Sequence, residues 1–373
     1  MTIKKRIILI SDAFYPENSP RSFRATELAK ALHELGHDIT ILTKFRNYDY
    51  SQFLAEHQFK LTMLHKPILP NVPEINLRPI SFILRGFKRM LTLLLEYPDI
   101  EGMYWVRKSL RNSARFDLMI SFAIPYYVHW GVAWARQKDL IAKTWIADCG
   151  DPYMFARLDR FRKPFYFKYL EMMFCRRCDY ISVPFVEMQK QFYPQFISKI
   201  KVIPQGFNFK EVNICKERPC SNTILFVFAG SVIPGKRDLT QLLNFLVALE
   251  YDFVFRIYTK QKDLFQKYKS SMGEKLEIYD YIDRLSLIFE MSKCDFLVNV
   301  DSSLDDQGNV EAVPSKLIDY ALSGRPILNI NSSRLDEDKV MAFLKKDYTR
   351  QRIIDLSKHD ITRVSTQFLE LAE

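Results

Sequence analysis

The chain has 373 residues, of which 48% are hydrophobic and 26% charged, the composition of a folded globular protein. Since a single core rarely grows beyond about 250 residues, this length predicts about two domains. The formal net charge of +10 favours an anionic partner. Nucleic acid is disfavoured, because the basic residues are dispersed and the sequence has no zinc-knuckle, RNA-recognition or KH signature. A phosphorylated small molecule or an anionic membrane is therefore the expected partner.

The first 43 residues predict a strand, a helix and a second strand. Residues 7–10 are apolar throughout and indicate a buried strand; the apolar run is too short for a signal peptide. After a loop rich in breaking residues, apolar side chains at helical spacing lead to Gly36, a typical C-terminal cap. Residues 39–42 form the next strand, and a strand–helix–strand unit predicts a parallel sheet.

One stretch of the first half is a candidate for contact with a membrane surface. It begins at Ile80, ends at Tyr97 and mixes basic with large apolar residues in the order ISFILRGFKRMLTLLLEY. A basic amphipathic helix can lie in the headgroup layer of an anionic membrane. The alternative, which we prefer, is a helix that turns its apolar side to the core and its basic side to solvent. No segment has 18 uninterrupted apolar residues, so we expect no membrane-spanning helix.

Further strands are predicted at residues 118–121, 144–147 and 180–183, with helical stretches between them. Cys175 and Cys178 form a lone C-x-x-C without a second pair at zinc-ligand spacing, and six cysteines in a chain of this length do not make a disulfide framework. We therefore interpret them as ordinary reduced thiols and expect a cytoplasmic protein without a bound metal.

A domain boundary is predicted at KVIPQGFNF, where a Pro and a Gly open a charged, irregular segment. The second series of strands is expected at residues 223–230, 253–258, 276–279, 296–300 and 327–330. The domains are accordingly 1–205 and 206–359, and residues 360–373 form a C-terminal helix that we expect to pack back on the first domain. Ligands of open parallel sheets bind beyond the carboxyl ends of the strands, so the loops after strands are the places to seek a site.

The first such loop leads into the helix predicted within EAVPSKLIDYALSG. Pro314 suits a first helical turn, and the free N–H groups around Ser315 can attract a phosphate. Glu311 lies just before the helix, and Asp319 shares a helix face with Ser315. Both carboxylates can accept hydrogen bonds from sugar hydroxyls. The alternative is that the two acids only balance the positive helix start.

The second loop, AGSVIPGKRDL, follows the first strand of the second half. Gly230 and Gly235 let the backbone approach a ligand, and the adjacent cations Lys236 and Arg237 suit a diphosphate. The loop is not a Walker motif, because Arg237 stands where Ser or Thr is needed. No G-x-G-x-x-G occurs either, which argues against a dinucleotide cofactor. A solvated turn is the alternative.

The remaining candidates lie in the first half. Arg21 and Arg24 flank the entry to the first helix, and either could instead be a surface residue. Asp148 and Asp151 follow a strand, where paired acids can do acid–base work, hold hydroxyls or merely cap the loop. His129, on an aromatic helix, is more often structural. DED at residues 336–338 resembles a diphosphate–metal motif but lies in a charged helical stretch, so we assign it no metal.

Four motifs in matching order resemble glycosyltransferase family 4, whose members have the two-domain GT-B fold. They are the opening ISDAFYPENSPRSFRATELAKALHELGHDITILT, the interdomain segment KVIPQGFN, the loop AGSVIPGKRDL and the signature EAVPSKLIDYALSGRPIL. The resemblance covers nearly the whole chain and is weakest at residues 44–117. It implies a nucleotide-sugar donor on the C-terminal domain, an acceptor on the N-terminal domain, and transfer that retains the anomeric configuration without a metal.

By this resemblance Glu311 matches the acid near the donor sugar, Asp319 the acid that holds the ribose, and Lys236 the lysine of the phosphate loop. Several positions depart from the family. The second acid is Asp rather than Glu. Ser231 stands where the family has an Arg, and Arg237 would supply that charge instead. The family's strand-end His has no counterpart near Asp148. Ser19 and Pro20 stand where the family has Gly-Gly, and Arg21 or Arg24 would compensate.

The sequence therefore predicts an α/β protein of GT-B fold, with two Rossmann-like parallel-sheet domains facing a central cleft. We expect a cytoplasmic glycosyltransferase, peripheral on the inner face of the plasma membrane, that uses a UDP-, GDP- or other nucleotide-sugar and no further cofactor to build a lipopolysaccharide, a capsule or a lipid-linked precursor. A noncatalytic GT-B scaffold and a sugar-nucleotide epimerase are the alternatives. The expected catalytic residues are Glu311, Lys236 and Asp148; the donor residues Gly230, Ser231, Lys236, Arg237, Glu311, Ser315, Lys316, Asp319 and Arg24; and the acceptor residues Arg21, His129 and Asp151.

Overall fold

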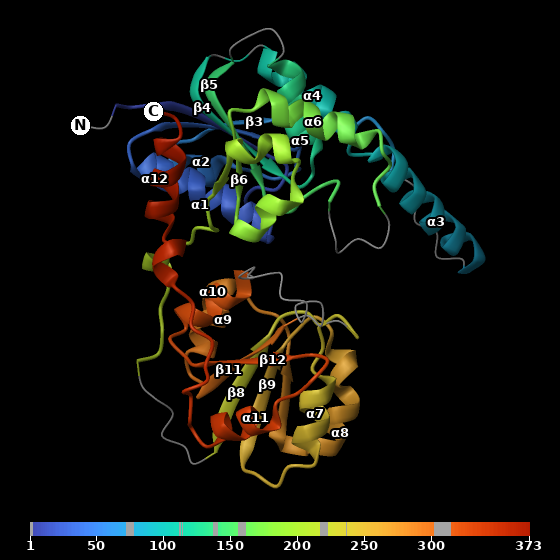
Figure 1. The fold of residues 1–373 in the computed structure, drawn as a ribbon, viewed down its shortest axis with the longest axis vertical. Coiled ribbons are helices and arrows are strands. Elements are labelled where there is room, and N and C mark those ends of the chain that lie inside the picture. Colours follow the sequence, from blue (N-terminus) through green and yellow to red (C-terminus); the bar gives the residue numbers. More distant parts are fainter. Residues whose placement is uncertain are drawn as a thin grey trace. The chain divides into compact units, whose positions relative to one another are not determined.

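The computed structural model describes residues 3–71, 78–111, 113, 115–136, 141–155, 162–216, 223–235, 237–301 and 315–373. The chain divides into two compact units. Unit 1 is formed by Met1–Phe207 and Ile361–Glu373, and unit 2 by Asn208–Asp360; Figure 1 labels their elements. The domain limits expected from the sequence lie within two residues of these divisions.

Unit 1 is built on a parallel sheet with the strand order β3-β2-β1-β4-β5-β6-β7. The strands are β1 (Arg6–Ser11), β2 (Asp38–Thr43), β3 (Lys60–Met63), β4 (Phe116–Ala123), β5 (Ala142–Cys149), β6 (Tyr180–Val183) and β7 (Ile200–Val202). The helices are α1 (Pro20–Glu34), α2 (Ser51–His57), α3 (Arg78–Leu95), α4 (Glu101–Arg111), α5 (Tyr127–Ala135), α6 (Phe167–Arg177) and α12 (Ile361–Glu370), with 3₁₀ turns η1 (Val186–Gln191) and η2 (Pro194–Lys199).

The two faces of this sheet carry separate apolar layers. In β1, Ile8 and Ile10 pack into the cluster that contains α4, α5 and α6, while Ile7 and Leu9 pack into the cluster of α1, α2 and α12. A strand that is buried on both faces must be apolar at every position, which is why RIILIS reads as a continuous hydrophobic run. Unit 1 is therefore a three-layer α/β/α sandwich.

Helix α12 follows unit 2 in the sequence but belongs to unit 1. Its buried Ile361, Val364 and Phe368 join the same apolar cluster as residues of α1, beside which it lies in Figure 1. The backbone N–H of Ile361 donates to the carbonyl of Phe207 at 3.1 Å. The segment expected to return to the first domain thus packs on its first helix.

The expectation of a core-facing helix at residues 80–97 is wrong. Helix α3 projects from the rest of unit 1 (Figure 1), and Phe82 and Ile83 are 75% and 67% exposed. Ile83, Phe87, Met90 and Leu94 follow the spacing i, i+4, i+7, i+11, so they form one exposed apolar face. The basic residues of this helix lie at other angles around its axis.

Unit 2 is a five-stranded parallel sheet with the order β10-β9-β8-β11-β12. The strands are β8 (Ile224–Ala229), β9 (Phe253–Tyr258), β10 (Leu276–Tyr279), β11 (Phe296–Asp301) and β12 (Ile327–Asn331). The helices are α7 (Thr240–Val247), α8 (Gln266–Met272), α9 (Arg284–Met291), α10 (Ser315–Leu322) and α11 (Glu337–Leu344), with 3₁₀ turns η3 (Phe209–Glu211), η4 (Lys262–Phe265), η5 (Gly273–Lys275) and η7 (Leu356–His359).

Helices cover both faces of this second sheet as well. The cluster on one face includes buried residues of α7, α8 and α11, and the cluster on the other includes those of α9 and α10. The stacked rings of Phe226, Phe255 and Phe296 cross three adjacent strands, with 4.6 and 4.8 Å between neighbouring ring centroids. The predicted α/β class and all of the predicted strands are confirmed.

Candidate functional site

The polar residues of unit 2 gather where its parallel strands end. Gly230 follows β8, Asp301 ends β11, and α10 begins at Ser315. The hydroxyl of Tyr320 accepts a hydrogen bond from the backbone N–H of Ala229 at 2.8 Å and thereby fixes α10 beside the end of β8. Lys316 lies one turn before Tyr320 on the same helix face, so it is held over the start of the loop after β8.

That loop turns back on itself as a small hairpin. Ile233 and Arg237 exchange two backbone hydrogen bonds, at 2.7 and 2.8 Å. Gly235 has a φ of +73°, which favours glycine, and its N–H donates to the carboxylate of Asp238 at 2.7 Å. Ser231 is exposed in the loop. The described residues of the expected phosphate loop therefore form a turn held by hydrogen bonds within the chain.

Gly230 has a backbone conformation that favours glycine and lies beside Lys316. Its φ is +137°, and a Cβ built on it would lie 4.0 Å from Cδ of Lys316. The Lys316 ammonium lies 5.3 Å from the centre of the Phe228 ring. Burial and the nearby charge of Arg237 lower the pKa of Lys316 to about 7, against the opposing effect of Asp301. The lysine is thus crowded by another cation, and an anion would relieve that repulsion.

A hydrogen-bonded group that the sequence did not predict lies at the ends of β11 and β12. Arg352 Nη1 donates to the two oxygens of Asp301 at 3.1 and 3.3 Å and to Asn329 Oδ1 at 3.3 Å. Asn299 donates to Asp301 at 3.0 Å and to Asn329 at 2.5 Å, and its own Oδ1 is buried without a hydrogen-bond partner among the described residues. The strand endings VNVD and LNIN were the signal that could have pointed to this group.

The charges at this edge are mostly positive. The positive charges of Arg237 and Arg352 both lower the pKa of Lys316, and the negative charge of Asp301 opposes them. The Arg237 Nε is buried and has no hydrogen-bond partner within the part of the chain that the structure describes. A buried donor without an acceptor costs free energy, so this arrangement favours an anionic ligand that accepts hydrogen bonds.

Asp319 does not stand alone as the sequence suggested. Its Oδ1 accepts from Arg284 Nε of α9 at 2.8 Å. Burial raises the pKa of Asp319, and the neighbouring guanidinium opposes that rise. The pair offers both an acceptor and a donor to a ligand. Glu311 and Lys236 lie outside the described residues, as does the side chain of Ser315.

In unit 1, Arg24 and Asp148 form a buried ion pair. Arg24 Nε and Nη2 donate to the two carboxylate oxygens at 2.6 and 2.7 Å, and Ser182 donates to the same carboxylate at 2.6 Å. Arg24 also donates to the carbonyls of Ile203 and Pro204, at 3.0 and 2.8 Å. The two side chains are 9% and 2% exposed. These contacts favour a structural role over the donor and catalytic roles that we expected.

His129 is also enclosed. Its Nδ1 lies 2.8 Å from the Ser121 hydroxyl, which accepts from the Trp145 indole at 2.8 Å, and its Nε2 lies 3.5 Å from Cys149 Sγ. Burial lowers the pKa of His129 to about 3, so the imidazole is neutral at physiological pH. Its surroundings indicate the structural alternative rather than contact with an acceptor.

Arg21 and Asp151, by contrast, meet at the surface of unit 1. They form an ion pair, and Arg21 also donates to the carbonyl of Ala123 at the end of β4. Gly150 lets the guanidinium pass, because a Cβ there would lie 2.7 Å from Arg21 Nη1. The sequence placed both residues on the acceptor side, and the structure brings them together at the carboxyl edge of the sheet.

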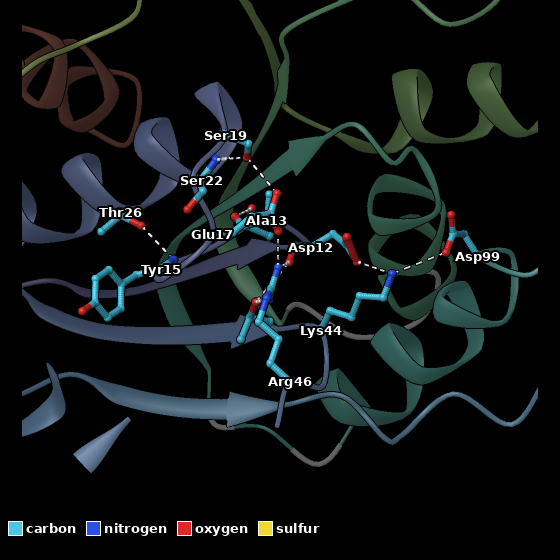
Figure 2. Close-up of polar contacts among 12 residues, drawn as sticks. Asp12, Ala13, Tyr15, Glu17, Ser19, Ser22, Thr26, Lys44, Arg46 and Asp99 are labelled. Atoms are coloured by element: carbon cyan, nitrogen blue, oxygen red, sulfur yellow. Dashed lines mark hydrogen bonds and ion pairs between the residues drawn. The ribbon is translucent and has the colours of Figure 1, made fainter. Parts of the chain in front are cut away.

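A second charged group at this edge was missed. Figure 2 shows the Lys44 ammonium between the carboxylates of Asp12 and Asp99, at 3.5 and 3.4 Å. The same view shows Arg46 paired with Glu17 at 2.6 Å. Asp12 follows β1 and Lys44 follows β2, so their positions just after strands were the available signal. Within the described ranges, no three His, Cys, Asp or Glu side chains gather as a metal site would require.

No family model and no curated protein sequence matches the chain, but solved structures do. The apo form of the lipopolysaccharide outer core galactosyltransferase WaaB is 12% identical, with a TM-score of 0.60 over 98% of both chains. The Anabaena protein HepE, in complex with UDP-glucose, is 11% identical, with a TM-score of 0.60 over 98% of both chains. A glycosyltransferase from Rickettsia africae is 12% identical, with a TM-score of 0.63 over 99% of this chain and 98% of its own.

These matches extend over both units and agree with the two parallel sheets described above. The chain therefore has the GT-B fold, as the sequence predicted. Among the helices of the described part, none combines the length and the apolar character needed to cross a bilayer.

Proposed function

We propose that the protein is a glycosyltransferase that moves a sugar from a nucleotide-sugar donor to a glycan or lipid-linked acceptor. The observation that carries the proposal is the positive edge of unit 2, where Arg237 has a buried Nε without a hydrogen-bond partner among the described residues and its charge lowers the pKa of Lys316. A nucleoside diphosphate supplies the negative charge and the acceptor oxygens that this edge lacks. Matches of similar fold include galactosyltransferase WaaB and a UDP-glucose complex, which supports this class of donor.

The residues divide the chemistry between them. The bond from the sugar C1 to the diphosphate breaks with its electron pair passing to the leaving phosphate, while the acceptor oxygen bonds to C1 and its proton passes to an oxygen of that phosphate. Lys316, Arg237 and Lys236, with the start of α10, stabilise the charge on the leaving group, the larger electrostatic task. Glu311 orients the donor sugar, and Asp319 with Arg284 receives the ribose. The transfer retains the anomeric configuration and proceeds without a metal.

The acceptor is carried by an anionic membrane, and the product is a bacterial surface polysaccharide or its precursor. Helix α3 supports this part of the proposal, because it holds four basic residues and no acidic one. Its exposed apolar face is suited to the boundary between headgroups and acyl chains, and its cations to anionic lipid. The protein works at the inner face of the plasma membrane in this proposal.

Donor binding is tested by calorimetry with a panel of UDP-, GDP- and ADP-linked sugars. We expect one donor to bind, and Lys316→Met and Arg237→Met each to weaken it roughly 10- to 100-fold, the usual effect of losing a hydrogen bond to a charged group. Lys267→Met is the matched control, since Lys267 is an exposed cation on α8. Wild-type protein that binds none of the panel overturns the proposal and favours a noncatalytic scaffold. Release of free nucleotide without any acceptor at an undiminished rate favours an epimerase.

A further inference from the structure

A small pocket of about 110 Å³ lies at the root of α3 in unit 1. Its lining comes from the segments on both sides of that helix: Leu69 and Asn71 before it, and Pro98 and Asp99 after it. Lys44, Tyr127 and residues of α4 complete the wall. We call it the α3-root pocket.

Hydrogen bonds hold the two segments together and so shape the pocket. The Glu101 carboxylate accepts the backbone N–H of Ile68 at 3.0 Å and that of Leu69 at 3.3 Å. The Tyr97 hydroxyl donates to the carbonyl of Pro70 at 2.5 Å. A backbone fixed by a carboxylate and a phenol on the returning segment makes the root of α3 a built feature rather than a loose loop.

One wall of the pocket is suited to hydroxyl groups. Lys44 lies between Asp12 and Asp99 (Figure 2), and Asp12 also accepts from the Tyr127 hydroxyl at 2.5 Å. Burial lowers the pKa of Lys44, but the two carboxylates outweigh it and raise that pKa, so the group is one ammonium and two carboxylates. Its net negative charge disfavours a phosphate or another anion. Neutral hydroxyls can both donate to the carboxylates and accept from the lysine.

The other wall is flat and aromatic. The rings of His65 and Trp105 are stacked, with centroids 4.3 Å apart and planes 16° apart. Glu101 accepts from the Trp105 indole at 3.5 Å and helps to fix the stack. Sugars present an apolar C–H face as well as hydroxyls, and a pocket with one flat apolar wall and one polar wall matches both.

We propose that the α3-root pocket binds an uncharged sugar ring of the acceptor, carried by a lipid in the membrane that α3 contacts. This inference rests on the proposed function and names the acceptor side of the same reaction. The sugar's hydroxyls lie against Lys44 and Asp99, and its C–H face lies on the His65–Trp105 stack. A hexose-sized headgroup extends beyond 110 Å³, so the pocket holds part of one ring and leaves the rest accessible for transfer.

The test uses the full chain and vesicles of phosphatidylcholine with phosphatidylglycerol. The vesicles carry no glycolipid, or a glucosyl, galactosyl, mannosyl or N-acetylglucosaminyl diacylglycerol, and binding is measured by co-sedimentation. We expect one glycolipid to raise the vesicle affinity at least fivefold. Asp99→Asn and His65→Ala should lose that increment and keep the basal affinity. Asp38→Asn, the same change at an exposed acid on the opposite end of β2, should keep both.

Three results overturn the inference. The vesicle affinity is not raised by any of the four headgroups, or the rise survives in both pocket variants. In the third, soluble methyl glycosides compete for binding as well as the glycolipid does, which would remove the role of the membrane. Failure of the proposed function gives a different result, because it is scored by calorimetric binding of nucleotide-sugars without vesicles. The pocket variants should leave that donor affinity unchanged. A variant that loses donor binding as well has not folded as expected and is replaced by Asp99→Ser.

Discussion

Replacement of Asp148 by asparagine distinguishes a structural role from a catalytic one. The carboxylate is 2% exposed and accepts hydrogen bonds from two nitrogens of Arg24 and from Ser182. An asparagine keeps the shape but turns one acceptor into a donor and removes the negative charge. The Arg24 guanidinium is then buried without a counter-ion, although its bonds to the carbonyls of Ile203 and Pro204 remain.

Breaking one side of such a buried pair typically costs about 3–5 kcal/mol, because the remaining charge is left desolvated. For a domain of 150–250 residues, each kcal/mol lowers the melting temperature by about 2–4 °C. Unit 1 is in this size range. We therefore expect its calorimetric transition to fall by at least about 6 °C in Asp148→Asn.

Asp151→Asn is the matched control, since the same chemical change falls on a side chain that is 55% exposed. A surface ion pair contributes about 0–1 kcal/mol, so the transition should move by no more than about 4 °C. Donor affinity in unit 2 should be the same in both variants. An Asp148→Asn protein that melts within 2 °C of wild type but has lost turnover would refute the structural role and restore the catalytic one.

Three further predictions concern stability. The pKa of Lys316 is lowered to about 7 in the folded protein, so between pH 7 and 9.5 the unfolded chain binds more protons than the folded one. The free energy of unfolding should therefore rise across that range by up to about 1.4 kcal/mol per pH unit. Urea titrations should show this rise in the wild type and not in Lys316→Met. Burial raises the pKa of Glu171 to about 7, so the free energy of unfolding falls as pH rises from about 4.5 to 7. Glu171→Gln should have a higher melting temperature than wild type at pH 8 but not at pH 4.5. Equal melting temperatures at pH 8 contradict this prediction. Gly131→Ala would place a Cβ 2.7 Å from the Met103 carbonyl oxygen and should lower the free energy of unfolding, measured in urea, by about 1–3 kcal/mol. A change below about 0.5 kcal/mol contradicts this prediction.

The central strands could be predicted because burial on both faces requires a continuous apolar run. β6 was placed at its observed limits, and β1, β8 and β11 within two residues. The sequence did not predict the two short edge strands β3 and β7. β3, KLTM, is mostly exposed and has no apolar pattern, and β7 has only three residues. The edge strand β10, by contrast, was predicted at its observed limits.

The orientation of α3 could not be derived from its sequence. Amphipathic periodicity shows that a helix has an apolar face but not what covers that face. The sequence of residues 80–97 favoured a core-facing helix. The exposure of Ile83 and Phe87 in the folded unit excludes that orientation.

The candidate site was predictable where local sequence sets it and obscure where distant residues meet. The glycines after β8 and the start of α10 are local features. The pairing of Arg24 with Asp148 joins positions 124 residues apart, and that of Arg352 with Asp301 joins positions 51 apart. Nothing in either local sequence reveals such a partner, so the sequence suggested a donor role for Arg24 and a separate catalytic role for Asp148, and it gave no signal for Arg352.

The return of α12 to unit 1 has a consequence for folding during synthesis. The apolar face of α1 that α12 covers is complete only after the whole of unit 2 has been translated. At about 5–20 residues per second, the intervening stretch takes roughly 8–31 s, during which that face is bare on the nascent chain. Unit 2 can close first, since all of its strands are contiguous in sequence. The unit that is translated first is therefore the one that finishes folding last, and its exposed helix face is a natural place for a chaperone to bind.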